Sequence, residues 1–200
     1  MSIYSILCSI LIVLTVLTVL TVLTVLTVIV YKDLKNRKKF FPELASFFTK
    51  GQSVLDFGSG SCLLETFLKN KNKVVNLDIY KGCSQTHTYD GYTIPFPDNS
   101  FDISFCMHVL HHIPHHRNIL KELKRVTKHR IIIVEEYYDS YISKLITAFH
   151  FLFFKQSMSY IENIHTPQEW ISLLNGGRFY PLHTQSLINP TPRYVIIKDL

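Results

Sequence analysis

Two carboxylates and a glycine-containing turn form the part of the sequence best suited to binding a ligand. Asp56 lies near the end of a short apolar run, and Gly58, Ser59 and Gly60 follow that run directly. Glycine lets the backbone approach a ligand closely, and the N-terminus of the helix expected after this turn favours a carboxylate or a phosphate. Asp78 comes at the end of the next apolar run, where a carboxylate can accept hydrogen bonds from ribose hydroxyls. The pattern therefore predicts a site for a sugar-bearing cofactor.

The same turn argues against a dinucleotide. The dinucleotide-binding fingerprint needs a third glycine at position 63, where this chain has Leu63. Asp56 also places a carboxylate where a pyrophosphate would be repelled. We therefore expect a cationic, sugar-bearing ligand, and a dehydrogenase is a more distant alternative.

Histidines gather in the segment that follows the fourth expected strand. His108, His111 and His112 come at the carboxyl end of that strand, where open α/β sheets bind ligands. Because a neutral imidazole can accept a proton near pH 7, His108 and His111 are candidate catalytic residues. The alternative is that these imidazoles belong to the scaffold of the loop. Glu135 and Tyr137, at the end of the fifth expected strand, are further candidates.

The histidine spacing also raises the question of a metal site. His111 and His115, like His112 and His116, have the i, i+4 spacing of a helical zinc pair. Pro114 lies between the members of both pairs and is expected to begin a helix, so neither pair shares a continuous helix. A zinc site needs three or four ligands in fixed geometry. We therefore expect no metal.

Strand and helix patterns alternate along residues 40–200, which predicts an α/β fold with a Rossmann-like, doubly wound and mostly parallel sheet. Residues 166–169 read as a capping box with proline at the first helical position, so a helix is expected to begin there. The last two strands predict a C-terminal antiparallel hairpin. The expected strands are residues 53–57, 74–79, 86–89, 101–109, 130–135, 179–187 and 193–198, and the other expected helices are 40–50, 62–69 and 115–128.

Five motifs resemble those of the class I S-adenosylmethionine-dependent methyltransferases, in particular the small-molecule, methyltransferase type 11-like branch. They are VLDFGSG, NLDIY, YDGYTIPFPDNSFD, FCMHVLHHIP and ILKELKRVTK, all between residues 51 and 136. The resemblance implies a Rossmann-like fold, methyl transfer and S-adenosylmethionine as the cofactor. Cys62 stands where the family often has a third glycine, and the segment after Ile79 is too short for the family's usual helix.

The resemblance also implies roles for single residues. The first motif would lie at the methionine end of the cofactor, the acidic residue of the second would bind the ribose, and the start of the third would lie beside the adenine. The implied cofactor-binding residues are Asp56, Gly58, Ser59, Gly60, Asp78, Asp90 and Gly91.

The N-terminal segment has a different character. Residues 3–31 carry no charge, and residues 13–27 are five copies of Val-Leu-Thr. A helix of this length would extend about 43 Å, enough to cross a bilayer with tilt. Basic residues follow only on its C-terminal side, which places the rest of the chain in the cytoplasm. We therefore predict a single-pass membrane protein with a transmembrane anchor (1–31), a basic juxtamembrane collar and short helix (32–50) and a methyltransferase-like domain (51–200). The alternative is a β-branched repeat that never inserts.

Charge and cysteine content bound the partners. The net charge is +6, but much of the excess lies in residues 32–39, so no nucleic-acid partner is expected. The four cysteines form no spaced framework and are expected as free thiols in a reducing cytoplasm.

These observations lead to one prediction and one alternative. The prediction is a membrane-anchored S-adenosylmethionine-dependent methyltransferase acting on a small or lipidic acceptor. The lipidic acceptor is suggested by the anchor together with the apolar residues 141–154, which otherwise read as a core helix. The alternative is a non-catalytic membrane-bound protein that binds S-adenosylmethionine or acts as a scaffold. The sequence indicates neither the acceptor's identity nor an oligomeric state.

Overall fold

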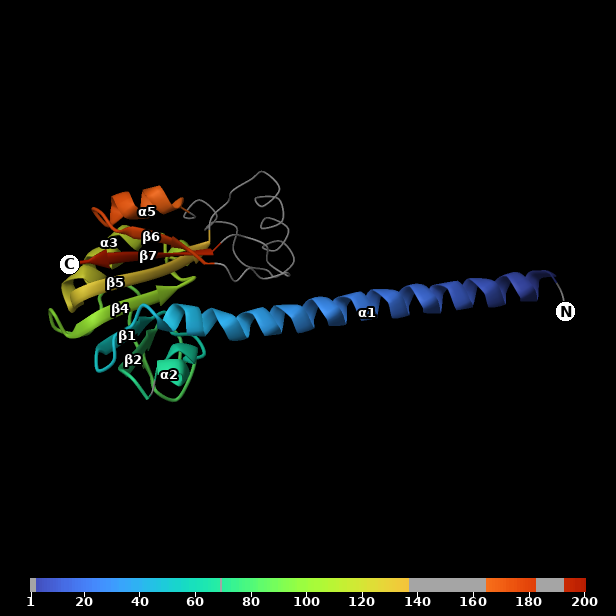
Figure 1. Ribbon diagram of the computed structural model, residues 1–200, viewed down its shortest axis with the longest axis horizontal. Coiled ribbons are helices and arrows are strands. Elements are labelled where there is room, and N and C mark those ends of the chain that lie inside the picture. The colour runs from blue at the N-terminus through green and yellow to red at the C-terminus, as the bar shows by residue number, and fades with distance from the viewer. Residues whose placement is uncertain (1–2, 69, 137–164, 183–192) are drawn as a thin grey trace.

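A seven-stranded sheet organises the computed structural model, which describes residues 3–68, 70–136, 165–182 and 193–200 (Figure 1). The strand order is β3-β2-β1-β4-β5-β7-β6. Every pairing from β3 to β5 is parallel, and β7 runs antiparallel to both of its neighbours. The strands are β1 (Ser53–Phe57), β2 (Lys73–Asp78), β3 (Thr86–Thr88), β4 (Phe101–Met107), β5 (Thr127–Glu136), β6 (Arg178–Pro181) and β7 (Arg193–Asp199).

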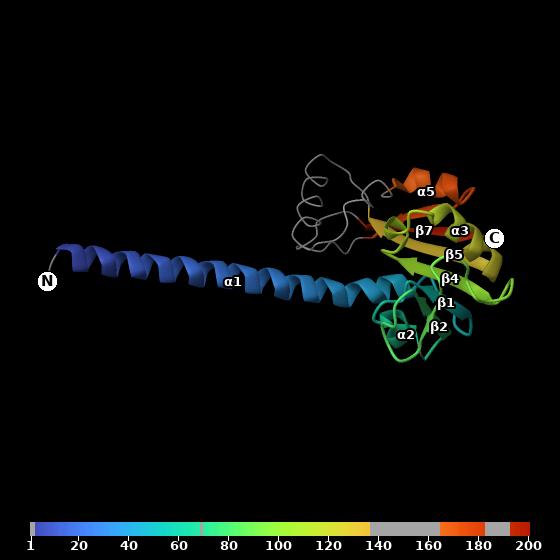
Figure 2. The same cartoon turned by 180° about the vertical axis from the view of Figure 1, so that it is seen from behind.

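Helices cover both faces of this sheet, as the views from the front and from behind show (Figures 1 and 2). One face packs against α3 (His116–Val126) and α5 (Pro167–Leu173). The other face packs against the C-terminal end of α1 (Ile3–Ala45) and against α2 (Leu63–Leu68). A short 3₁₀ helix, η1 (Leu110–His112), follows β4. The predicted doubly wound α/β fold is confirmed.

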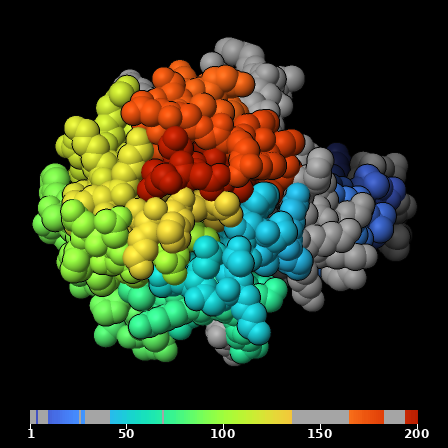
Figure 3. All heavy atoms as spheres, turned by 60° about the vertical axis from the view of Figure 1, so that its left-hand side comes forward, coloured from blue at the N-terminus to red at the C-terminus, as the bar shows by residue number. Residues whose placement is uncertain are grey.

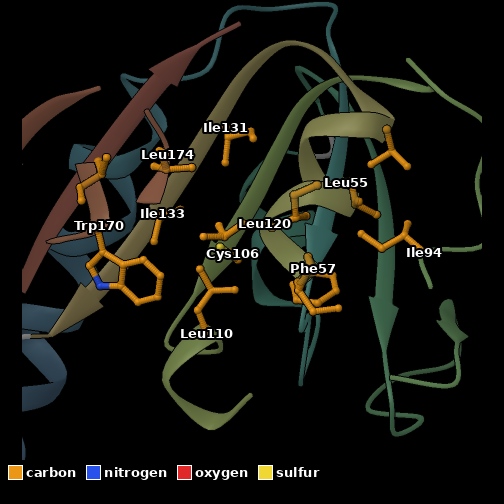
Figure 4. Close-up of a cluster of buried hydrophobic side chains, with 14 of the residues drawn as sticks. Leu55, Phe57, Ile94, Cys106, Leu110, Leu120, Ile131, Ile133, Trp170 and Leu174 are labelled. Carbon is orange, nitrogen blue, oxygen red and sulfur yellow. The ribbon is translucent and has the colours of Figure 1, made fainter. Parts of the chain in front are cut away.

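The side chains of β5 show why its stretch from Ile131 to Val134 is entirely apolar. Ile131 and Ile133 point into the core on the α3 and α5 side, whereas Ile132 and Val134 point into the core on the α1 and α2 side. A parallel strand covered on both faces needs apolar residues at every position. Figure 4 shows the first of these cores, where Leu120, Trp170 and Leu174 lie against Ile131 and Ile133.

The helix α5 begins as the sequence predicts. The hydroxyl of Thr166 accepts a hydrogen bond from the backbone N–H of Glu169, and the Glu169 carboxylate accepts one from the backbone N–H of Thr166. This reciprocal pairing satisfies two backbone donors that the start of a helix leaves open. It holds the helix so that Trp170 is fully buried.

The C-terminal strand β7 pairs with β5, which lies far before it in the sequence. Residues 193–199 pair with residues 130–136 along β5, and β6 pairs with the other edge of β7, so the predicted antiparallel hairpin is confirmed over its described residues. Figure 3 shows the end of the chain in red between β5 in yellow and the α5–β6 region in orange. The turn at 189–192 and the apolar segment 141–154 lie outside the described residues.

The N-terminal helix differs from the expectation. The predicted separate helix at 40–50 is instead the last part of α1, which runs without a break through Pro42 to Ala45 (Figure 1). Leu44 and Phe48 are buried against the sheet and fix the position of this end. In the repeat, each threonine hydroxyl donates a 2.8 Å hydrogen bond to the carbonyl four residues earlier, as expected for threonine in a helix.

The predicted membrane localisation is wrong. In the part of the chain that the structure describes, no helix combines the length and the apolar character that crossing a bilayer requires. This finding overturns the prediction of a transmembrane anchor at residues 1–31 and of a catalytic domain held on the cytoplasmic side.

Candidate functional site

A cavity of about 470 Å³ opens at the carboxyl ends of the parallel strands. Open α/β sheets bind ligands at this edge because the loops that leave neighbouring strands diverge there. The lining residues come from the loops after β1, β2, β3 and β4: Phe57, Gly58, Asp78, Ile79, Tyr80, Tyr89, Gly91, His108, Val109, His112, Ile113, Pro114 and His115.

In the glycine turn after β1, Gly58 lines the cavity, whereas Ser59 and Gly60 do not. Gly58 has φ +70° and Gly60 has φ +48°, and the backbone N–H of Gly58 donates to the carbonyl of Leu77 at 2.7 Å. A Cβ atom at Gly58 would overlap the side chain of Val109. Glycine is therefore required here both for the left-handed backbone and for the close approach of the loop after β4.

The Asp78 carboxylate links the end of β2 to the glycine turn after β1. One oxygen of its carboxylate accepts a hydrogen bond from the backbone N–H of Gly60 at 2.9 Å, and the other accepts one from the backbone N–H of Tyr80 at 3.1 Å. Each carboxylate oxygen can accept a second hydrogen bond. Asp78 lines the cavity, so its carboxylate can also accept hydrogen bonds from a ligand's hydroxyls.

Asp56 lies beneath the turn rather than in the cavity wall. Only 4% of its surface is exposed, and it is not among the lining residues. Burial, together with the nearby charges of Asp78 and Glu65, raises the pKa of Asp56 to about 7. The Asp56 carboxyl therefore changes charge near neutral pH, and it does so two residues before the glycine turn.

The loop after β3 is shaped by Asp90. Its carboxylate accepts hydrogen bonds from the backbone N–H groups of Tyr92 and Thr93, which hold the pKa of Asp90 below its usual value. Gly91 lines the cavity, whereas Asp90 does not. Nε2 of His115 donates to the Gly91 carbonyl at 2.9 Å, and the His115 ring stacks on Tyr92. This role of His115 is not predicted from the sequence.

The candidate catalytic histidines lie in different surroundings. His108 lines the cavity, and its backbone N–H donates to the carbonyl of Val134 at 2.9 Å. His111 does not line the cavity, and its Nδ1 lies 2.5 Å from the buried carboxylate of Glu135. His112 does line the cavity, and burial followed by the charge of His111 lowers the pKa of His112 to about 4.

His108, His111 and His112 lie near one another, with ring centroids 6.4 Å apart for His108 and His111 and 4.0 Å apart for His111 and His112, but the histidines of this segment take separate partners. His111 contacts Glu135, His115 contacts the Gly91 carbonyl, and His116 contacts His165. Within the described ranges, no group of three His, Cys, Asp or Glu side chains could hold one metal ion.

A disulfide joins Cys62 to Cys83, which corrects the prediction of free thiols at these positions. The segment after β2 contains no helix, as expected, and turns back so that Gly82 lies directly against the Gly60 carbonyl. This return brings Cys83 to the start of α2, where its Cα lies 6.3 Å from that of Cys62. Cys106 is a free thiol buried in the core.

Comparisons with known proteins bear on this site. Residues 55–134, from β1 through most of β5, match the family model described as a methyltransferase domain. The chain contains a methyltransferase domain. The predicted class of enzyme, an S-adenosylmethionine-dependent methyltransferase, and the predicted cofactor are confirmed. No protein among the curated sequences matches the chain.

Solved structures share the fold of this methyltransferase domain. A SAM-dependent methyltransferase from Methanosarcina mazei is 20% identical, with a TM-score of 0.60 over 79% of this chain and 96% of its own. A SAM-dependent methyltransferase from Aquifex aeolicus is 18% identical, with a TM-score of 0.56 over 84% of this chain and 97% of its own.

The cavity of the methyltransferase domain suits S-adenosylmethionine. Its volume lies within the range of small-molecule sites, roughly 300–1,000 Å³. Ile79, Tyr80 and Tyr89 offer flat or apolar surface for a base, and Asp78 offers free acceptor positions for ribose hydroxyls. Asp78 also presents a carboxylate to the cavity, which suits a ligand that carries positive charge.

Proposed function

We propose that this methyltransferase domain binds S-adenosylmethionine in the cavity after β1, β2, β3 and β4 and transfers its methyl group to a small-molecule acceptor. The position of Asp78 carries the proposal. It lies at the end of β2, lines the cavity and accepts hydrogen bonds from the backbone N–H groups of Gly60 in the glycine turn and of Tyr80 in the loop after β2. The catalytic unit in this proposal is residues 51–200, with the buried Leu44 and Phe48 packed against it.

In this proposal the residues around the cavity bind different parts of the cofactor. Gly58, Ser59 and Gly60 lie beside the methionine portion, with the Asp56 carboxyl beneath them. Asp78 accepts hydrogen bonds from the ribose hydroxyls. The adenine lies along the loop at residues 90 and 91, whose backbone at Gly91 lines the cavity. Asp90 supports that loop through its turn hydrogen bonds.

Methyl transfer needs in-line approach of an acceptor atom to the methyl carbon, so holding the two reactants in line provides much of the acceleration. The cofactor supplies the electrophilic methyl group when it is bound. In this proposal His108 receives a proton when the acceptor must lose one, because it lines the cavity at the end of β4. His111, the other candidate, contacts Glu135 and acts on the reaction only through the loop it holds.

Calorimetry tests the cofactor site directly. We expect the full chain to bind S-adenosylmethionine and to show no heat with NAD. Asp78→Ala should weaken the affinity at least tenfold, because the substitution removes the acceptor for ribose and the hydrogen bond from Gly60. Asp98→Ala is the matched control, since Asp98 is 71% exposed and pairs with Arg125. Absence of binding to S-adenosylmethionine, or unchanged affinity in Asp78→Ala, would refute the proposal.

A further inference from the structure

Glu135 is a buried carboxylate to which the proposed function gives no direct role. It lies at the end of β5, is 1% exposed and does not line the cavity. One of its oxygens accepts hydrogen bonds from the backbone N–H groups of Leu110 at 3.0 Å and Val109 at 3.3 Å. The other lies 2.5 Å from Nδ1 of His111. A single side chain thus contacts three consecutive residues of the loop after β4.

The charge of Glu135 is retained in spite of its burial. Burial by itself raises the pKa of a carboxyl, but the charge and hydrogen bond of His111, with a smaller effect from His108, outweigh it and lower the pKa of Glu135. Hydrogen bonds to a charged group are stronger than those between neutral groups. The loop is therefore held by an ionised acceptor in a site from which water is excluded.

The loop that Glu135 holds forms one wall of the cavity. His108, Val109 and His112 all line the cavity, and they flank or include the residues that donate to Glu135. The Val109 side chain also lies so close to Gly58 that a Cβ there would overlap it. A displacement of Val109 would therefore change the distance between this wall and the glycine turn.

His111 connects the pair to the cavity in a second way. Its ring centroid lies 4.0 Å from that of His112, which faces the ligand. The charge of His111 opposes protonation of His112 and adds to the effect of burial. A neutral imidazole at this position does not repel a sulfonium cofactor. The Glu135–His111 pair thus favours a cavity wall without positive charge.

We propose that Glu135 is a positioning residue of the cofactor cavity: its carboxylate fixes the loop at residues 108–112 so that His108, Val109 and His112 face Gly58 and Asp78. The inference rests on the proposed function, because it takes this cavity as the binding site for S-adenosylmethionine. The proposal adds Glu135 on β5, a strand to which the proposed function assigns no cofactor-binding residue.

The test measures S-adenosylmethionine affinity by calorimetry in wild type, Glu135→Gln and Glu135→Ala. Glu135→Ala removes all three contacts and should weaken the affinity at least tenfold. Glu135→Gln keeps an acceptor oxygen for the Leu110 N–H, so it should retain part of the lost affinity and remain folded. In both variants the downfield proton resonance of the His111 Nδ1–H, which a short hydrogen bond to a carboxylate produces, should disappear.

Asp102→Ala is the matched control for lost stability. Asp102 also accepts two hydrogen bonds, from the backbone N–H and the hydroxyl of Ser53, but it does so at the start of β4, at the opposite end of that strand. Its variant should bind S-adenosylmethionine as the wild type does. Wild-type affinity in the Glu135 variants, or an equal loss in Asp102→Ala, would overturn the role of Glu135 and leave the cofactor site standing. If the wild type itself does not bind, the proposed function fails and this inference fails with it.

Discussion

Replacing Asp56 with asparagine should make the folded protein more stable and its cofactor site weaker. The pKa of Asp56 is raised from 3.8 to about 7, chiefly by burial. Between these two values the folded protein holds a proton that the unfolded chain has released, so stability falls as the pH rises. A shift of about three units at 1.36 kcal/mol per unit gives a penalty of up to about 4 kcal/mol above pH 7.

Asparagine has nearly the same shape and no charge, so Asp56→Asn removes this penalty. Urea denaturation of the cofactor-free protein should show the variant more stable than wild type by up to about 4 kcal/mol at pH 8, with the difference shrinking towards pH 5. Asp102→Asn should behave in the opposite way. The hydrogen bonds from Ser53 lower the pKa of Asp102, so the loss of its charge removes stability that is present at neutral pH and lost on acidification.

The binding measurement completes the test. At pH 8 the wild-type carboxylate is ionised and attracts a cationic cofactor, so Asp56→Asn should weaken S-adenosylmethionine binding at that pH. At pH 6, where the wild-type group is mostly protonated, the two proteins should differ less. A variant that is less stable than wild type at pH 8, or a stability difference that is the same at both pH values, would refute the reasoning from burial.

Two further predictions follow from the glycine turn and the disulfide. Gly58→Ala should lower the free energy of unfolding by about 1–3 kcal/mol and weaken cofactor binding, because the added Cβ is strained at φ +70° and overlaps Val109. Gly51→Ala, with φ +88° and open space around an added Cβ, carries the strain alone, so calorimetry should show its cofactor affinity unchanged. In the double variant Cys62→Ser, Cys83→Ser, urea denaturation should show a free energy of unfolding about 3 kcal/mol lower than in wild type, because the disulfide closes a loop with a sequence separation of 21. Equal stability of the two proteins would contradict this expectation.

Local patterns were sufficient for most of the fold. The alternating and apolar runs located the strands within a few residues, and the capping box located the start of α5, because both signals depend on residues close in sequence. The helix predicted at 40–50 is not a separate element, because α1 continues through Pro42 to Ala45. Leu44 and Phe48 pack into the core on the α1 and α2 side of the sheet, a contact with strands far along the chain that local spacing does not show.

The candidate site was predictable only in part. Of the residues singled out from the sequence, Gly58, Asp78, Gly91 and His108 line the cavity, because each ends a strand or lies in the loop after one at the same edge of the sheet. The burial of Asp56 was not predicted from local spacing. Leu55 and Phe57 pack into the core on the α3 and α5 side, so the two-residue alternation of β1 turns Asp56 to the side covered by α1 and α2, where it is buried.

The sequence by itself determined the α/β alternation and the motifs of a methyltransferase domain, because these depend on neighbouring residues and on fixed spacings. Only the tertiary structure decided which partners distant side chains take. The approach of β5 to the loop after β4 pairs Glu135 with His111, and the return of the loop after β2 joins Cys62 to Cys83. Such pairings depend on the crossing of segments far apart in the chain, and residue type and local spacing do not encode that geometry.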